Sequence, residues 1–173
     1  MKRAFSLLLC LALTLSLAGC ARTYNGTDEL IEKAREEIPI SDAATVDMQF
    51  AGGYVLGENA LFWFISGNEY QARYYLPMEV EIKREDQYKF VRTYEPLDSS
   101  PKDIAVLLWN NSYVFLINNP ACAAIRITDE NGTYEKTIEA DAYPYVFSCP
   151  SKPEFSPIPT DYVFLDADGN ELG

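Results

Sequence analysis

The sequence predicts a mainly β protein, an antiparallel β-sandwich preceded by one short N-terminal α-helix. Turn signals recur roughly every eight to twelve residues after Pro39, which is the spacing typical of sandwich strands. The segments between these turns are rich in β-branched and aromatic residues, which favour strands. They do not alternate with helix-length amphipathic segments, so the sequence does not favour a parallel sheet built from βαβ units.

The helix is expected over residues 27–38. Thr27 or Asp28 can cap its first turn, and Pro39 ends it because proline cannot continue a helix. The apolar residues fall on a single stripe, so the helix should pack by one face: Leu30, Ile31, Ala34 and Ile38.

The next strands are expected within residues 61–75, LFWFISGNEYQARYY, where six of the fifteen residues are aromatic. Gly67-Asn68 fits a two-residue hairpin turn. That register places three pairs on one face: Leu61 with Tyr74, Trp63 with Ala72, and Ile65 with Tyr70. Because residues 61–65 are apolar on both faces, we expect a central strand that the helix or a second sheet covers on each side.

A second hairpin is expected from residues 78–82 and 88–94. Glu79 and Glu81 should point outward, where Lys89 and Arg92 can pair with them across the strands. The inward residues alternate with these: Met78, Val80, Ile82, Tyr88 and Phe90, with Tyr94 as a further candidate.

The remaining strands follow the same pattern and complete a sandwich of the immunoglobulin-like or a similar kind. Two further hairpins are expected, the second from the Asn-Gly pair in its turn: residues 104–109 with 113–117, and 123–128 with 133–138. Residues 145–148 and 161–165 should form the last strands. Between them, residues 150–159 carry four prolines and read as an extended connection. That connection could present Phe155 and Ile158 to a partner, although a simple crossover is favoured.

The first twenty residues, MKRAFSLLLCLALTLSLAGC, have the organisation of a secretory signal. A basic start, Lys2 and Arg3, precedes an apolar run that is shorter than a membrane-spanning helix. The run ends in Leu17-Ala18-Gly19-Cys20, which resembles the lipobox of bacterial lipoproteins. The resemblance implies cleavage before Cys20 and diacylation of its sulfur with fatty acids such as palmitate, so that the mature chain is anchored to the outer side of a bacterial membrane.

The resemblance divides the chain into three parts. Residues 1–19 are the expected lipoprotein signal peptide, and residues 20–26 are the lipidated Cys20 with a short polar tether. Residues 27–173 are expected to form a single β-rich domain. Because two acyl chains anchor a protein stably, no basic patch or amphipathic helix is needed for attachment.

Composition excludes several classes of function. The net charge is −12, and such an acidic surface repels nucleic acid. The chain has no histidine, which excludes Ser-His-Asp and Cys-His catalysis as well as His-ligated zinc and haem. No cofactor and no metal are expected.

Cys122 and Cys149 are the cysteines of the mature domain besides Cys20. An even pair in an oxidising compartment predicts a disulfide, with two buried thiols as the alternative. Their spacing matches neither a redox Cys-x-x-Cys motif nor a metal ribbon.

Aromatic side chains are the first candidates for a ligand surface. Trp63, Tyr70 and Tyr74 share a face in the predicted hairpin and could stack on sugar rings. Apolar neighbours occupy that face too, and an exposed mixed patch would favour aggregation, so the core interpretation is preferred. A second set of rings could form a platform at the loop ends: Trp109, Tyr113 and Tyr143.

Acidic side chains are the second set of candidates. Asp166, Asp168 and Asn170 alternate as in the start of a calcium loop, but Glu171 stands where such a loop has glycine, so a turn at Asp168-Gly169 is favoured. Glu69, in the predicted turn beside the aromatic strands, is the candidate for carboxylate catalysis.

From these observations we expect a lipid-anchored, non-enzymatic binding or accessory protein. Its partner would be an envelope protein or a glycan. The alternative hypothesis is a carboxylate-dependent hydrolase of envelope polysaccharide, which requires two acidic side chains roughly 5–10 Å apart in an open cleft.

Overall fold

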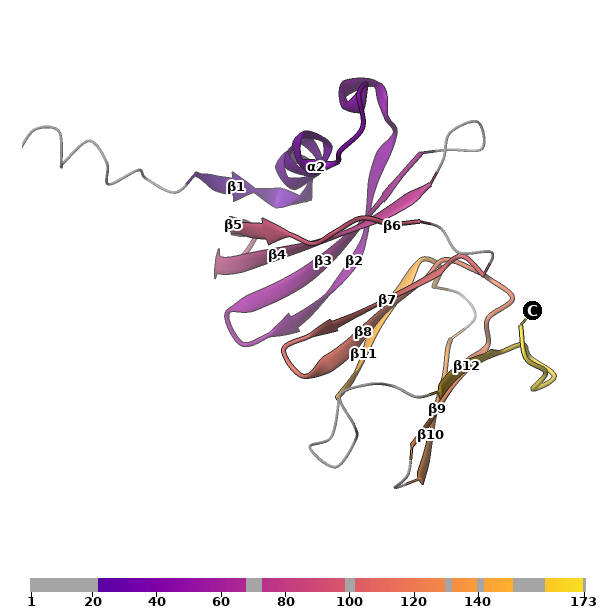
Figure 1. Cartoon of the computed structure of the whole chain (residues 1–173). Coiled ribbons are helices and arrows are strands. Elements are labelled where there is room, and N and C mark those ends of the chain that lie inside the picture. The colour runs from indigo at the N-terminus through magenta and orange to yellow at the C-terminus, as the bar shows by residue number, and fades with distance from the viewer. Residues whose placement is uncertain are drawn as a thin grey trace, which may run out of the picture.

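The computed structural model describes residues 22–67, 73–98, 102–129, 132–139, 142–150 and 161–172. Within these ranges the chain forms antiparallel sheets with one α-helix near the N-terminus, which confirms the predicted fold class (Figure 1). The strands form three sheets, one more than a two-layered sandwich requires.

The largest sheet, sheet A, has six strands and carries the helix. Its path is β1-β5-β4-β3-β2, and β6 pairs with β4 beyond that path. The strands are β1 (Thr23–Asn25), β2 (Met48–Leu56), β3 (Asn59–Ser66), β4 (Tyr74–Arg84), β5 (Gln87–Thr93) and β6 (Leu97–Asp98). Helix α2 (Gly26–Glu37) and the short 3₁₀ turn η1 (Ala43–Thr45) connect β1 with β2.

Two three-stranded sheets follow in the second half of the chain. Sheet B has the order β11-β8-β7, from β7 (Ile104–Trp109), β8 (Ser112–Ile117) and β11 (Tyr145–Pro150). Sheet C has the order β10-β9-β12, from β9 (Ala124–Asp129), β10 (Gly132–Thr137) and β12 (Asp161–Leu165). The predicted hairpins β7–β8 and β9–β10 are confirmed, and so are the predicted strands in β11 and β12.

The layers stack in the order α2, sheet A, sheet B, sheet C, with a hydrophobic core between each pair (Figure 1). Leu30 and Ala34 of α2 are buried against one face of sheet A. Leu61 and Trp63 on the other face of β3 pack against sheet B. The far side of sheet B, including Phe115, packs against sheet C. The prediction that the strand around residues 61–65 is covered on both sides is therefore confirmed.

The predicted register of β3 with its partner is wrong. Ser66 lies opposite Tyr74 and Ile65 opposite Tyr75, because β3 runs on to Ser66 and β4 starts only at Tyr74. The hydroxyl of Ser66 accepts a hydrogen bond from the backbone N–H of Tyr74 at 3.2 Å, which holds this longer connection. Relative to the two-residue turn the pairing shifts by an odd number of positions, so Tyr74 moves to the opposite face from Trp63.

The fold begins earlier than the predicted domain boundary. Thr23–Asn25, assigned from sequence to the tether, forms β1 and pairs with β5, Thr23 opposite Lys89. The helix starts one residue before the predicted position and ends at Glu37, ahead of Pro39. At its start the backbone N–H of Asn25 donates to the Glu29 carboxylate at 2.9 Å. This contact satisfies one of the amides that a helix start leaves unpaired.

Sheets A and B approach most closely beside β2. Gly52 has φ +123°, and a Cβ there would lie 3.2 Å from a methyl group of Val146 on β11. At Gly53 a Cβ would lie 2.3 Å from Cδ1 of Phe62, whose ring covers the glycine. The two glycines therefore let β2 pass close to its neighbours, next to the β-bulge between Phe50 and Gly52.

Candidate functional site: a groove at the carboxyl end of α2

A hollow of about 320 Å³ opens where α2 ends. Pro39 stops the helix, and Ile38 takes an extended conformation, as residues before proline prefer. The chain therefore changes direction at the end of the helix, and residues 38–40 form one wall of the hollow. The start of β4 and the segment after β5 form the opposite wall. The lining is mostly apolar: Ile38, Pro39, Ile40, Tyr74, Glu95 and Pro96.

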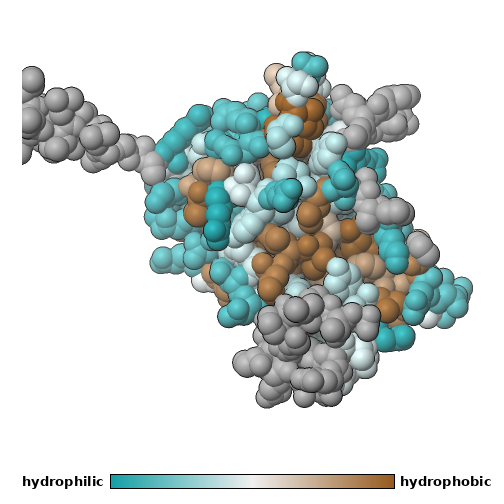
Figure 2. Space-filling model, viewed as in Figure 1, coloured by the Kyte–Doolittle hydropathy of each residue, from teal (hydrophilic) through white to brown (hydrophobic). Residues whose placement is uncertain are grey.

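A second hollow of about 340 Å³ adjoins the first, and Ile38 and Ile40 line both. Its other walls come from α2 and η1: Glu32, Arg35, Glu36, Ala43 and Ala44. We call the two hollows together the α2 groove. Figure 2 shows hydrophobic side chains near the top of the molecule, over the segment that joins α2 to β2, with hydrophilic side chains around them.

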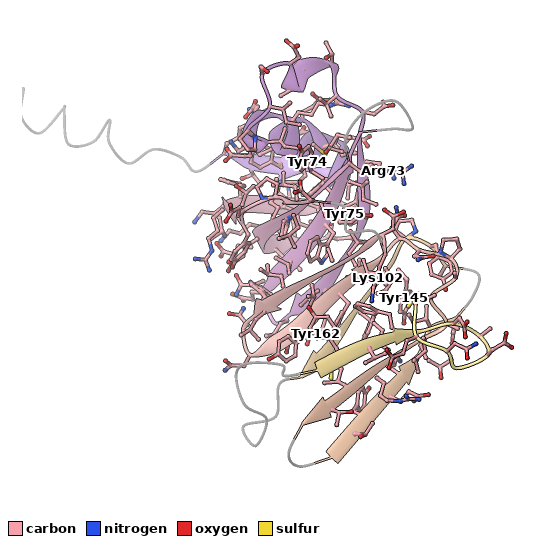
Figure 3. The ribbon with its side chains drawn as sticks, turned by 45° about the vertical axis from the view of Figure 1, so that its right-hand side comes forward. Arg73, Tyr74, Tyr75, Lys102, Tyr145 and Tyr162 are labelled. Carbon is pink, nitrogen blue, oxygen red and sulfur yellow. The ribbon has the colours of Figure 1, made fainter. Side chains whose placement is uncertain are left out.

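The aromatic wall of the α2 groove is Tyr74. It is half-buried and packs on the α2 side of sheet A. Its neighbour Tyr75 is fully buried on the other side, where its hydroxyl donates to Asp103 at 2.9 Å. Figure 3 shows the two rings leaving β4 at different levels, Tyr74 beside α2 and Tyr75 towards Lys102. Burial, with the bond to Asp103, raises the pKa of Tyr75, so this side chain is neutral in the folded protein.

Acidic side chains form the rim of the α2 groove. Glu32, Glu36 and Glu95 are exposed there, and Arg35 is the basic residue of the lining. Arg35 pairs with Glu32, and its Nε donates to the backbone carbonyl of Val46 at 3.2 Å. This guanidinium therefore links α2 to Val46, the residue just after η1. The link fixes the position of α2 relative to η1, and both elements line the second hollow.

Glu79 is a buried carboxylate outside the α2 groove. It was expected to point to solvent, but it lies between sheets A and B beside the core that contains Trp109, and its residue is only 9% exposed. Burial alone would raise its pKa. Hydrogen bonds from Tyr94 at 2.7 Å and Arg92 at 2.8 Å outweigh that effect and hold the pKa below its usual value. The predicted pairing with Arg92 is confirmed, whereas the predicted exposure is wrong because the second sheet covers this position.

The rings predicted as loop-end platforms are mostly part of the cores. Trp109 and Tyr113 are buried, and Trp109 meets Tyr54 edge to face with centroids 6.1 Å apart. Tyr143 is half-buried and donates its hydroxyl to the carbonyl of Cys122. Trp63 is fully buried, as the preferred core interpretation predicted. Tyr70 lies outside the described residues.

The acidic candidates do not assemble a metal site. One oxygen of Asp166 accepts the backbone N–H groups of Asp168 at 2.9 Å and Asn170 at 2.8 Å, so the carboxylate shapes a turn. These hydrogen bonds lower the pKa of Asp166, and the bond from the Asn170 backbone has the largest effect. In the part of the chain that the structure describes, no group of three His, Cys, Asp or Glu side chains could hold a metal ion. Glu69 and the segment with Phe155 and Ile158 lie outside that part.

The two cysteines among the described residues lie in the same core. Cys122 and Cys149 are both buried between sheets B and C, and both are thiols in the structure. The Cys122 thiol donates to the Ala124 carbonyl at 3.6 Å, and burial raises its pKa to about 11. A disulfide between the two cysteines stays a prediction.

Comparison with known proteins adds no further indication. No family model, curated protein or solved structure matches this chain. Among the described residues, no helix is long and apolar enough to cross a membrane. Cys20 lies outside the described residues.

Sequence reasoning did not single out the α2 groove. Its lining comes from three places far apart in the chain, residues 32–44, Tyr74 and residues 95–96, which only the fold brings together. The sequence Ile38-Pro39-Ile40 gave no local signal of a groove, because Ile38 is buried in the core under α2 and Ile40 packs against the same core.

Proposed function

We propose that this protein is a bacterial lipoprotein that binds an envelope protein without catalysing a reaction. Cys20 carries the lipid anchor, and the α2 groove receives the partner. The observation that carries the proposal is the composition of the α2 groove, in which an apolar floor around Ile38 and Ile40 is bordered by exposed carboxylates.

This composition fits one chemical class of partner. A peptide segment with a hydrophobic side chain next to lysine or arginine would place the apolar group against the isoleucines and its charge near Glu95 or Glu36. A glycan fits less well, because sugar sites combine ring faces with several hydrogen-bonding groups and Tyr74 is the one ring in the lining described here.

The hydrolase alternative has weaker support. Glu32 and Glu36 share the second hollow, but both are exposed on α2 and each has an ion-pair partner, Arg35 and Lys33 respectively. Carboxylates that act as general acids need an environment that excludes water and raises their pKa. Glu79 is buried, but it is committed to hydrogen bonds between two sheets.

The test uses the full-length lipidated chain in its own bacterium. A photo-crosslinking amino acid at Glu95 should give a discrete protein adduct, whereas the same probe at the exposed Glu139, beyond β10, should give none. Glu95→Lys should weaken recovery of that partner at least tenfold, because it reverses a rim charge. Equal adducts at both positions would contradict the proposal.

A second measurement separates the glycan class. The lipidated chain in detergent is incubated with purified cell-wall sacculi in low and high salt. If the partner is a protein that binds through the acidic rim, the chain should not remain on the sacculi in high salt. Retention in high salt that Tyr74→Ala abolishes would replace the protein partner with a glycan.

A further inference from the structure

The position of β1 limits how far the domain can lie from its anchor. Only Ala21 and Arg22 separate Cys20 from Thr23, which is already paired with Lys89 in sheet A. A fully extended chain spans at most about 3.6 Å per residue, so the α-carbons of Cys20 and Thr23 lie within about 11 Å of each other. The lipidated residue is thus joined almost directly to the sheet.

Thr23 belongs to a row of residues that crosses five strands of sheet A, in the order β1, β5, β4, β3 and β2. The registers place Thr23 beside Lys89, Lys89 beside Glu81, Glu81 beside Asn59, and Asn59 beside Leu56. We call this row the ledge. It lies on the face of sheet A that sheet B covers, but beyond Leu61 and Trp63, which are the residues that sheet B buries. Leu56 at its end is 42% exposed.

The charge around the ledge differs from that of the rest of the protein. Arg22, residues 56–59 and residues 79–92 together contain five basic and five acidic side chains and are neutral overall, whereas the whole chain has a net charge of −12. Lys83 and Lys89 both pair with Glu81, so two ammonium groups share one carboxylate. Their side chains are 40% and 39% exposed. The basic residues therefore gather where the anchor joins the fold.

The α2 groove lies at the other end of the same elements. Tyr74 is seven residues along β4 from Glu81, a separation of about 23 Å in an extended strand. Helix α2 starts at Gly26, whose N–H donates to the Asp86 carbonyl in the β4–β5 turn, and ends beside the α2 groove. In Figure 1, β1 and the turns of the hairpins β2–β3, β4–β5 and β7–β8 lie on the same side of the molecule.

We propose that the ledge is a membrane-contact surface that seats the domain directly on the phosphate headgroups of the bilayer. This inference rests on the lipid anchor in the proposed function and adds to it an orientation. Lys83 and Lys89 face the phosphates, and Leu56 reaches the interface at the tip of β2. The α2 groove then points away from the bilayer, where an envelope partner can enter it.

The experiment measures lysine acetylation in the full lipidated chain reconstituted in vesicles of phosphatidylethanolamine and phosphatidylglycerol. A second chain carries roughly 12 Gly and Ser residues inserted between Ala21 and Arg22, which adds about 20 Å of flexible reach. Lys83 and Lys89 should be acetylated several-fold more slowly in the original chain than in the extended chain. Lys136 on β10 in sheet C is the internal control and should be acetylated equally in both.

Each outcome decides the inference. Equal acetylation of Lys83 and Lys89 in the two acylated chains overturns the seating on the bilayer and leaves the proposed function standing. Intact mass without acyl groups on Cys20 overturns the anchor itself, and with it the seating. Protection that depends on the protein-to-lipid ratio would assign the ledge to contact between copies of the chain and would also overturn the inference.

Discussion

The hydroxyl of Tyr94 donates a 2.7 Å hydrogen bond to the carboxylate of Glu79, which also accepts from Arg92. Glu79 lies on β4, and Tyr94 lies just after β5, at the margin of the core between sheets A and B. The Arg92 guanidinium lies over the Tyr94 ring at 4.8 Å from its centroid. A charge that would be costly to bury alone is thus held by a phenol and a guanidinium that remains largely in water.

Glu79→Ala should lower the free energy of unfolding by about 2 kcal/mol. The substitution leaves the partly buried Tyr94 hydroxyl without its acceptor, whereas Arg92 stays solvated because its side chain is 60% exposed. Urea unfolding measures the change. The matched control is Glu135→Ala, whose pair with Arg126 is exposed on both sides and should contribute less than about 0.5 kcal/mol. Equal losses in the two variants would contradict this prediction.

Stability should decrease in acid partly through Glu79. The pKa of Glu79 in the folded protein lies below the ordinary glutamate value of 4.5, so the unfolded chain takes up this proton at a higher pH than the folded chain. The contribution is therefore complete above pH 4.5 and is lost as pH falls through the folded pKa. Urea midpoints measured from about pH 6 to 3 should fall less steeply for Glu79→Gln than for the original chain. Parallel curves would contradict the assignment.

Between about pH 6 and 8 stability should stay constant, because the chain has no histidine to titrate there. At higher pH it should fall. Burial, with the bond to Glu79, raises the pKa of Tyr94 from 10.0 to about 12, so its protonated form stabilises the fold below pH 10 and that contribution is lost as pH rises through 12. In the Tyr94→Phe variant, the unfolding temperature measured by circular dichroism should therefore fall less steeply with rising pH above 10 than in the original chain.

Gly53→Ala should destabilise the protein by about 2–3 kcal/mol, since the new methyl group must displace the Phe62 ring. Phe62→Leu in the same chain should recover at least about 1 kcal/mol of the loss, because the two sites are in contact. Gly57→Ala is the comparison: nothing lies within 4 Å of its Cβ, and its φ of +63° alone should cost about 1 kcal/mol. Additive effects of Gly53→Ala and Phe62→Leu would refute the steric explanation.

Native Cys122 should be inert to iodoacetamide at pH 8. It is fully buried, and a pKa of about 11 leaves roughly one thiol in a thousand ionised at that pH. The Cys149→Ala variant isolates the signal of Cys122, and its alkylation is followed by intact mass with and without urea. Alkylation of the folded variant at the rate of the unfolded one would show that the core between sheets B and C opens readily.

The hairpin β7–β8 could be predicted from sequence because its turn is local chemistry. Asn110 and Asn111 adopt positive φ values of 46° and 57°, a conformation that asparagine tolerates better than most residues. The pairing β3–β4 could not be predicted in the same way. Residues 61–65 are apolar on both faces, so no polar face indicated the correct register. The pair Gly67-Asn68 fits a two-residue turn, and the pairing built on that turn placed Tyr74 on the wrong face of the sheet.

The burial of Glu79 and the strand at Thr23–Asn25 depended on tertiary structure. Alternation along β4 correctly placed Glu79 on the face opposite Met78, but that face meets a second sheet whose position no local pattern indicates. Thr23, Tyr24 and Asn25 form too short a segment to show a strand period, and their pairing depends on β5, more than sixty residues away. The α2 groove was hidden for the same reason.

The stacking of four layers bears on how such a protein can change during evolution. Strands β3 and β8 are buried on both faces, so a substitution at any position along them must suit two cores at once. Helix α2 exposes one side and strand β10 is exposed at all but one position, so both carry fewer constraints. Sequence divergence should therefore collect in the outer layers, and a lineage can alter the lining that α2 gives to its groove while the two inner sheets keep the same packing.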